Sequence, residues 1–385
     1  MRSRSSASRP LTRCGVGALA GAALVAAALL SGCGDGDGGG AESLTVYVSL
    51  PLRGPSAADG RDVADGARLA LADAGGAAAG VEVRARYLDD TEGPARSATW
   101  TPARAAADAR AATEDSTAIA YLGDFDSGAS RASLPITNEA SLLQVSPASG
   151  AVDLVAPFPG SDDLPEAQPS GRRTFARVIP ADDAQARAAA GWVRRLGVRR
   201  VATVSDGSRF GNDMVTVFED TLAGAELTRR RAQLIFYGGE PDREPVAIPR
   251  GFGGRLLTSD AELAPGAVEA QPAGTLATSA ALAPSRLPPS GLDFSRRFAA
   301  RYHRRPGRYA AYGYEAMAAI LDAIDRASDP GDRESVVHAF LDTSGRDSVI
   351  GRYSIDEVGD TTLGRMTGYR IIGGHPVDVA ELSAR

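Results

Sequence analysis

Ser127 is the residue whose type and position best suit the binding of a small polar group. It follows an apolar stretch, 118–122, that predicts a buried strand, and it precedes a stretch, 128–140, with helical spacing. At the start of a helix the backbone N–H groups lack partners and the helix dipole favours an anion. The Ser127 hydroxyl can cap its own helix or donate a hydrogen bond to a ligand, and the local sequence leaves both interpretations open.

Cys33 stands at a position where a lipid could be attached. Four arginines precede an apolar run at 15–30, and Leu30-Ser31-Gly32-Cys33 follows. This order is that of a secretory signal, and the apolar run is short for a membrane span of about 20 residues. The last four residues resemble the bacterial lipobox, in which the cysteine is lipidated and becomes the new N-terminus.

We therefore expect a signal peptide at 1–32 and a flexible, Gly- and Asp-rich tether at 33–43. A lipid on Cys33 would hold the exported protein at the outer face of the cell membrane. An ordinary signal with a chance cysteine and an uncleaved anchor are the alternatives.

Residue types that commonly do catalysis are scarce. The three histidines, His303, His338 and His375, lack metal-binding spacing, and no Gly-x-Ser-x-Gly elbow occurs. Cys14 would leave with the signal, so the mature chain would have neither an internal disulfide nor a free cysteine nucleophile. We expect a protein without enzymatic activity, metal or cofactor, and an envelope hydrolase is the least favoured alternative.

Charge and length narrow the class of protein. The chain of 385 residues has 42 basic and 48 acidic residues, and loss of the four signal arginines would change its net charge from −6 to −10. Such a chain is a poor candidate for binding nucleic acid. Every basic residue is arginine, so lysine-dependent catalysis is excluded. A mature chain of about 340 residues exceeds one comfortable core, which predicts two lobes.

Strand-like and helix-like segments alternate, which predicts α/β structure with parallel sheets and crossover helices. A loop rich in Pro and Ser is expected at 157–172, and a turn between two strands at Gly359-Asp360. The expected strands are 44–50, 81–88, 118–122, 142–145, 200–204, 234–237, 256–258 and 276–280. The expected helices are 62–74, 103–112, 128–140, 184–196, 211–222, 294–303, 312–327 and 334–341.

Six stretches carry a family resemblance in their order along the chain. They are LPLRGP at 50–55, GDFDSGA at 123–129 with LPITNEA at 134–140, VSPAS at 145–149, RRVATVSDGSRFG at 199–211, AYGYEA at 311–316 and DEVGD at 356–360. Together they resemble the extracellular solute-binding proteins of the Leu/Ile/Val and amide type, the type I periplasmic-binding family.

The resemblance implies two Rossmann-like lobes with parallel sheets, joined by hinge strands around a cleft that closes on ligand. It implies that lobe 1 comprises 44–178 and 281–350, and lobe 2 comprises 179–280 and 351–385. The second lobe is expected to be shortened by about one βα unit, because only about ten residues separate the helix at 211–222 from the next strand.

The resemblance also implies a ligand site. Ser127 would contact the ligand's α-carboxylate, and Ala148 would offer backbone groups. The family's threonine falls at Gly150, so that hydroxyl is missing unless Ser149 replaces it. Phe210 would supply an aromatic contact, with the core as the alternative. Asp260 would hold the ligand's ammonium, with an ordinary surface position as the alternative.

Acidic residues stand at two positions where the family often has aromatic ones. They are Asp59 and Glu240, and Tyr309 could form another wall. If Asp59 and Glu240 line the cleft, they favour a cationic or polar ligand over leucine, and neutral replacements should weaken the binding of a cation.

The expected function is that of a lipid-anchored, extracellular substrate-binding protein. It would capture a small polar, amino-acid-like molecule for an ABC importer, with the importer's permease and the membrane lipid on Cys33 as its partners. The alternative is a degenerate member that acts as a ligand sensor or a partner-binding surface lipoprotein. A receptor needs an open polar cleft at Ser127 and Ala148, whereas an interaction protein would have that cleft filled.

Overall fold

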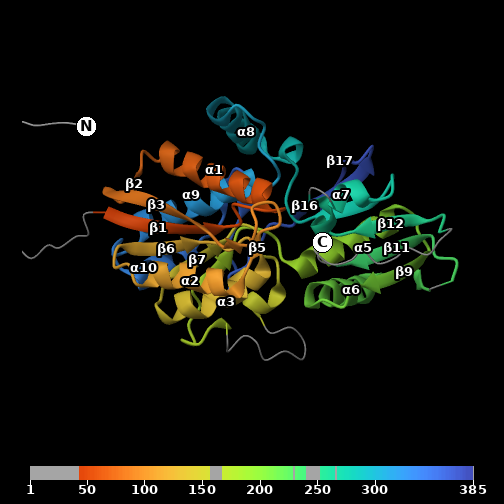
Figure 1. Ribbon diagram of the computed structural model, residues 1–385, viewed down its shortest axis with the longest axis horizontal. Helices are drawn as coiled ribbons and strands as arrows, with labels where there is room; N and C mark the ends of the chain where they lie inside the picture. The colour runs from red at the N-terminus through yellow and green to blue at the C-terminus, as the bar shows by residue number, and fades with distance from the viewer. Residues whose placement is uncertain (1–42, 157–166, 229, 240–251, 265–266, 385) are drawn as a thin grey trace, which may run out of the picture. The chain divides into compact units, whose positions relative to one another are not determined.

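The computed structural model describes most of the chain beyond the expected signal. Residues 40–385 cluster as one compact unit that contains two main β-sheets with helices packed on them (Figure 1). The predictions for Cys33, Glu240 and most of the 157–172 loop lie outside the described residues. None of the described helices has the length and apolar run needed to cross a membrane. The described residues are 43–156, 167–228, 230–239, 252–264 and 267–384.

The first sheet has the strand order β2-β3-β1-β6-β7-β8, and all of its strands except β2 run parallel. Side chains of its central strand alternate between two cores, as the pleat requires: Val46 and Val48 face one, and Tyr47 faces the other. The strands are β1 (Ser43–Leu50), β2 (Ala77–Ala78), β3 (Val81–Asp89), β6 (Ala118–Leu122), β7 (Leu143–Ser146) and β8 (Phe175–Arg177).

Helices cover both faces of this sheet. In Figure 1, α1 (Ala57–Asp73) and α9 (Ala310–Arg326) lie on one side, and α2 (Pro102–Thr113) and α3 (Ser127–Glu139) lie on the other. The core on the α1 side also includes residues of α8 (Pro289–Tyr302) and α10 (Arg333–Leu341). Two small antiparallel pairs complete this part: β4 (Thr91–Glu92) with β5 (Thr99–Trp100), and β14 (Arg346–Ser348) with β15 (Gly351–Tyr353).

The second sheet has the order β10-β9-β11-β12-β13-β16-β17. Its first five strands run parallel, and β16 and β17 extend it as an antiparallel hairpin. Phe236 faces the core beneath α5 and α6, whereas Ile235 and Tyr237 face the opposite side. The strands are β9 (Arg200–Ser205), β10 (Glu226–Leu227), β11 (Leu234–Gly238), β12 (Arg255–Thr258), β13 (Leu276–Ser279), β16 (Arg365–Ile372) and β17 (His375–Ser383). The helices are α5 (Asp182–Arg195), α6 (Arg209–Thr221) and α7 (Ala267–Ala270), and short 3-10 turns lie at Val152–Leu154, Asp260–Leu263 and Pro284–Arg286.

The chain passes between the two sheets three times. Residues 178–181 lead from β8 to α5, residues 280–288 lead from β13 to α8, and residues 354–364 lead from β15 to β16. Each sheet is therefore built from segments that are distant in the sequence. Because the crossing segments lie beside both sheets, they are the natural places for a hinge.

The α/β organisation and the parallel strands agree with the sequence-based expectation, and the differences are local. Helix α1 begins at Ala57, five residues earlier than expected, and it includes Gly60, where an added Cβ would lie 2.1 Å from the Pro51 carbonyl oxygen. The short connection expected after the helix at 211–222 is seen at the edge of the second sheet. Between α6 and β11 the described residues form only the two-residue strand β10 and no helix.

The C-terminal tail differs more from the expectation. The turn at Gly359-Asp360 forms, with an isolated bridge between Ile355 and Thr361. However, the long hairpin of β16 and β17, which turns at Gly373-Gly374, was not predicted.

Helices α1 and α9 touch through glycines. A Cβ atom on Gly66 would lie 2.1 Å from the carbonyl oxygen of Ala310, and one on Gly313 would lie 2.2 Å from that of Val63. No real side chain fits such gaps without moving a backbone. The close crossing buries the apolar face of α9 against α1 and the first sheet.

We predict that Gly66→Ala destabilises the fold by about 2–3 kcal/mol, because it forces the two helices apart. The matched control is Gly191→Ala in α5, where the added Cβ would meet its nearest atom only at 3.6 Å. The control should be neutral or stabilising by about 0.5–1 kcal/mol, since alanine favours helix. Denaturant unfolding of residues 41–385 measures both, and equal midpoints for the two variants would contradict the account.

Candidate functional site

A pocket of about 360 Å³ lies where the two sheets meet. Its walls come from loops that follow the carboxyl ends of β1, β6 and β7 in the first sheet and of β9 and β12 in the second. In open α/β sheets, ligands bind beyond the carboxyl ends of the strands, where neighbouring connections diverge. In this chain, the loops after the strands of both sheets line the same pocket.

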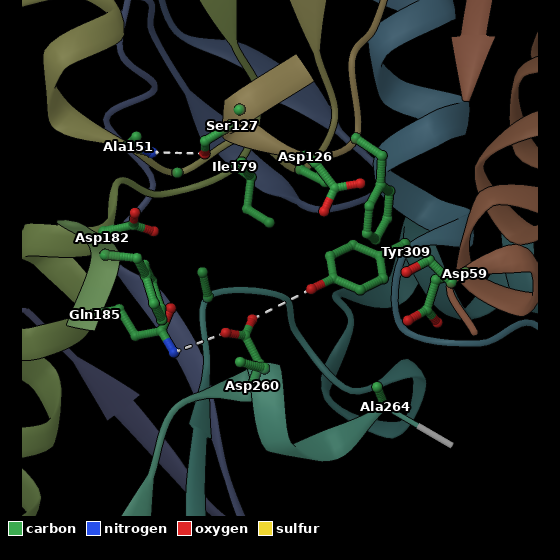
Figure 2. A pocket seen from close by; sticks show the side chains of 18 of the residues that line it. Asp59, Asp126, Ser127, Ala151, Ile179, Asp182, Gln185, Asp260, Ala264 and Tyr309 are labelled. Carbon is green, nitrogen blue, oxygen red and sulfur yellow. Dashed lines mark hydrogen bonds between the residues drawn. The ribbon is translucent and has the colours of Figure 1, made fainter. Parts of the chain in front are cut away.

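Ser127 lines this pocket as the first residue of α3, and Asp126 precedes it at the N-cap position. The backbone N–H of Ala151 donates a hydrogen bond to the Ser127 hydroxyl oxygen at 3.1 Å (Figure 2). The bond fixes the hydroxyl between the loops after β6 and β7. Because it uses an oxygen lone pair, the hydroxyl proton can still be donated into the pocket.

The loop after β7 brings two of its three expected residues to the pocket. Ala148 and Gly150 line it, and the Ala148 N–H donates to the Ser146 hydroxyl at 3.2 Å. Ser149 lies behind the wall, fully buried, with its hydroxyl 2.9 Å from the Asp124 carbonyl oxygen and 2.8 Å from the Ser130 hydroxyl. The Ser149 hydroxyl therefore does not replace the missing threonine.

Asp260 lines the pocket from the second sheet, at the end of β12. Gln185 Nε2 donates to one carboxylate oxygen at 3.2 Å, while the hydroxyls of Tyr309 and Ser279 donate to the other, each at 3.2 Å. These three donors orient the carboxylate. The bond from Tyr309 also links α9, which packs on the first sheet, to the second sheet (Figure 2).

Aromatic side chains form further parts of the wall. The rings of Phe125 and Tyr309 meet edge to face, with centroids 4.9 Å apart. Phe210 lines the pocket and also packs against the core of the second sheet, and its contact with a ligand stays a prediction. Trp100 lines the pocket from β5 and lies over Gly128, where an added Cβ would be only 2.4 Å from the indole ring.

Two arginines, Arg131 and Arg308, line the pocket in the described part of the chain, and each is paired with a carboxylate. Arg308 contacts Asp59 at 3.1 Å, so the charge of Asp59 is offset within the wall. Arg131 forms a bidentate ion pair with the buried Asp153, with both N–O distances at 2.7 Å. The sequence-based argument for a cationic ligand cannot rest on Asp59, because Arg308 supplies the opposing charge.

Asp182, the first residue of α5, also lines the pocket. Burial raises the pKa of its carboxyl group to about 7, with the positive charge of Arg177 opposing the rise and the negative charge of Asp260 adding to it. Neither a hydrogen bond nor an ion pair joins this carboxyl group to another residue of the described chain. Figure 2 shows Asp126, Asp182 and Asp260 around the pocket, with Asp59 beyond the Tyr309 ring.

Sequence reasoning missed Trp100, Arg131, Asp182, Gln185 and Arg308. Asp182 and Gln185 occupy one face of a helix that was expected two residues later, and Trp100 reaches the pocket through the β4–β5 pairing, which has no local signal. Of the expected residues, the structure brings Ser127, Ala148, Gly150, Phe210, Asp260, Asp59 and Tyr309 to one pocket.

Buried carboxyl groups lie behind the first-sheet wall. Asp90 is fully buried, and neither of its carboxyl oxygens has a hydrogen-bond partner among the described residues. Burial raises its pKa to about 9, and the negative charges of Asp124 and Asp126 add to the rise. Burial also raises the pKa of Asp124 to about 7, although Ser133 and Tyr121 donate hydrogen bonds to that carboxyl group.

We predict that Asp90 lowers stability as the pH rises. The pKa of Asp90 is higher in the folded than in the unfolded chain. The free energy of unfolding therefore falls progressively between pH 4 and about pH 9, as the unfolded chain releases this proton more readily than the folded chain. Asp90→Asn should reduce the loss of unfolding free energy between pH 5 and pH 9 by about 2–4 kcal/mol. The same curves for Asp220→Asn, which changes an exposed carboxylate on α6, serve as the control. Wild-type and Asp90→Asn curves that run parallel would refute this assignment.

Comparisons with known proteins agree with this architecture. A family model described as periplasmic binding protein matches residues 43–247. A leucine-binding protein from Thermotoga maritima is 24% identical, with a TM-score of 0.70 over 88% of this chain and 99% of that chain. An ABC transporter substrate-binding protein from Desulfitobacterium hafniense in complex with Leu is 21% identical, with a TM-score of 0.72 over 88% and 100%.

A third similar structure holds a different kind of molecule. It is a solute-binding protein of an ABC transporter from Rhodopseudomonas palustris in complex with 3,4-dihydroxybenzoic acid, 16% identical, with a TM-score of 0.67 over 89% and 98%. Among curated protein sequences none matches significantly. At these identities the likeness establishes the fold, and the type I periplasmic-binding fold expected from the sequence is confirmed.

Proposed function

The chain belongs to the periplasmic binding protein family, and from this premise we propose that it captures a small polar molecule in the pocket between its two sheets. The observation that supports this most is the open pocket of about 360 Å³, lined by Ser127, Ala148 and Gly150. A pocket of this size and lining suits a small ligand. It is also the feature that favours a receptor over a degenerate, partner-binding protein, whose cleft would be filled.

Capture would be a binding event without a chemical step. We propose that the segments 44–178 with 281–350 and 179–280 with 351–385 act as two lobes that close around the ligand. Ser127 would donate its hydroxyl proton from one lobe, while Asp260, held by Gln185, would accept from the other. The Tyr309–Asp260 hydrogen bond would join the lobes at the side of the pocket.

The proposed place of action is the outer face of the cell membrane. The signal at 1–32 would export the chain, a lipid on Cys33 would anchor it, and residues 33–43 would leave the binding unit free to move. The bound molecule would then pass to the permease of an ABC importer. Similar proteins are described as substrate-binding proteins of ABC transporters, which supports this destination.

We predict that residues 41–385 are stabilised by one class of small molecule in a thermal-shift screen. The panel holds aliphatic, basic and acidic amino acids, amides, polyamines and aromatic acids. A ligand present at 100 times its dissociation constant adds about 2.7 kcal/mol, which should raise the melting temperature by a few degrees. A cooperative melt that no class shifts would overturn the receptor function.

Ser127→Ala tests the pocket assignment. Loss of one hydrogen bond to a charged or polar ligand should weaken binding by about 1–2 kcal/mol, or roughly tenfold. Ser295→Ala is the matched control, because that hydroxyl bonds to the Gly291 carbonyl oxygen on α8 and does not line the pocket. An unchanged affinity in Ser127→Ala, measured by calorimetric titration, would place the ligand elsewhere.

We predict that lipidation depends on Cys33. The full chain produced in a bacterium that processes lipoproteins should partition with the membrane fraction and label with a fatty-acid probe, and Cys33→Ser should abolish the label. Cys14→Ser, which changes the other cysteine, is the control and should leave the label unchanged. A label that persists in Cys33→Ser would refute the anchor.

A further inference from the structure

The carboxyl group of Asp182 occupies the space that a side chain at position 150 would need. A Cβ atom on Gly150 would lie 1.9 Å from Asp182 Oδ1 and 2.8 Å from its Cγ. The Asp182 backbone N–H also donates to the Gly150 carbonyl oxygen at 2.8 Å, which fixes the start of α5 against this loop. The Asp182 side chain can therefore take this position only while residue 150 is glycine. As a result, a carboxyl group lines the pocket where a side chain of residue 150 would otherwise lie.

Asp260 adds a second negative charge to the pocket, beside that of Asp182. Asp182 and Gln185 are three residues apart on α5, so they share one face of the helix, and Gln185 holds Asp260. The two carboxylates interact unfavourably with each other, and neither forms an ion pair with a described residue. The two arginines that line the pocket among the described residues are already engaged, Arg308 with Asp59 and Arg131 with Asp153.

We infer that Asp182, seated over Gly150, selects the ligand: the pocket takes an organic cation whose ammonium or guanidinium group binds the Asp182 carboxylate, and it disfavours a ligand carboxylate at that point. This inference rests on the proposed capture of a small molecule. A positive nitrogen would supply direct hydrogen bonds and an ion pair, which none of the described residues gives the Asp182 carboxylate. A ligand carboxylate in the same place would meet a like charge.

The remaining wall suits an apolar body attached to that nitrogen. The rings of Trp100, Phe125, Phe210 and Tyr309 line the pocket. Aromatic faces attract cations as well as apolar groups, so they complement a ligand that is positive at one end and hydrophobic along its length. The expected ligand class is therefore an amine or guanidine with a short aliphatic or aromatic body.

The test uses two series of molecules that differ only in charged groups. The first is phenethylamine, phenylalanine and hydrocinnamate, and the second is pentylamine, norleucine and hexanoate. Residues 41–385 are titrated with each at millimolar concentrations by calorimetry and thermal shift. We expect the amine of at least one series to bind, and the corresponding carboxylate without an amine to bind at least tenfold more weakly.

Asp182→Asn keeps the side-chain volume and removes the charge, so it should weaken amine binding at least tenfold. Asp183→Asn is the matched control, because Asp183 is the next residue of the same turn, pairs with Arg187 at 2.8 Å and does not line the pocket. Gly150→Ala should weaken binding through steric overlap, and Gly150→Ala combined with Asp182→Ala should remove that overlap and lose the preference for the amine. Unliganded melting temperatures show whether each variant folds.

Amine affinity should also rise with pH, because the Asp182 carboxylate must be deprotonated to bind a cation. With a pKa of about 7, the affinity should increase about tenfold from pH 6 to pH 8. The facing groups that influence this titration are Asp260, Asp183, Arg177 and Arg131. The pH dependence should vanish in Asp182→Asn and persist in Asp183→Asn.

The outcomes separate this inference from the proposed function. Binding of hydrocinnamate or hexanoate in preference to the amines would overturn the cation assignment and leave the receptor function standing. Equal amine affinity in the wild type and in Asp182→Asn would do the same. No binding by any member of either series would overturn the cation assignment, and the wider panel described above then decides whether the receptor function survives.

Discussion

The carboxyl ends of the parallel strands in both sheets point to one space, and the pocket depends on this single constraint. Parallel strands need crossover helices, so the loops at their carboxyl ends gather on one edge of each sheet. The three passages of the chain between the sheets bring the two edges together. Ser127 follows β6, Asp260 follows β12, and both reach the same pocket although 133 positions separate their numbers.

Charge pairing decides which of the pocket's groups can serve a ligand. Asp59 and Arg308 offset each other, as do Arg131 and Asp153, so these four residues chiefly fix the wall. Asp182 is left without such a partner among the described residues, and its position depends on the absence of a side chain at Gly150. The absence of a side chain at Gly150, in the loop after β7, therefore allows α5 to present the negative charge of Asp182 to the pocket.

The sequence predicted the fold well because the order of strands and helices is a local property. Short apolar runs located β1, β6 and β7, and the loops that follow β6 and β7 supplied Ser127 and Ala148. The pairing of Asp59 with Arg308 could not be predicted, because it joins α1 to the residue before Tyr309 through tertiary packing. Trp100 was missed for the same reason, since its place depends on the β4–β5 pairing.

Trp100 offers the most direct measurement of whether the pocket takes up a small molecule. The chain has two tryptophans, and Trp192 is a residue of α5 that is buried in the core of the second sheet, so Trp192→Phe leaves a single indole on the pocket wall. The account predicts that titration of this variant with the amino-acid and amine panel changes Trp100 fluorescence saturably, with one molecule bound per chain. A variant that melts cooperatively but shows no change in Trp100 emission with any compound would contradict the central claim.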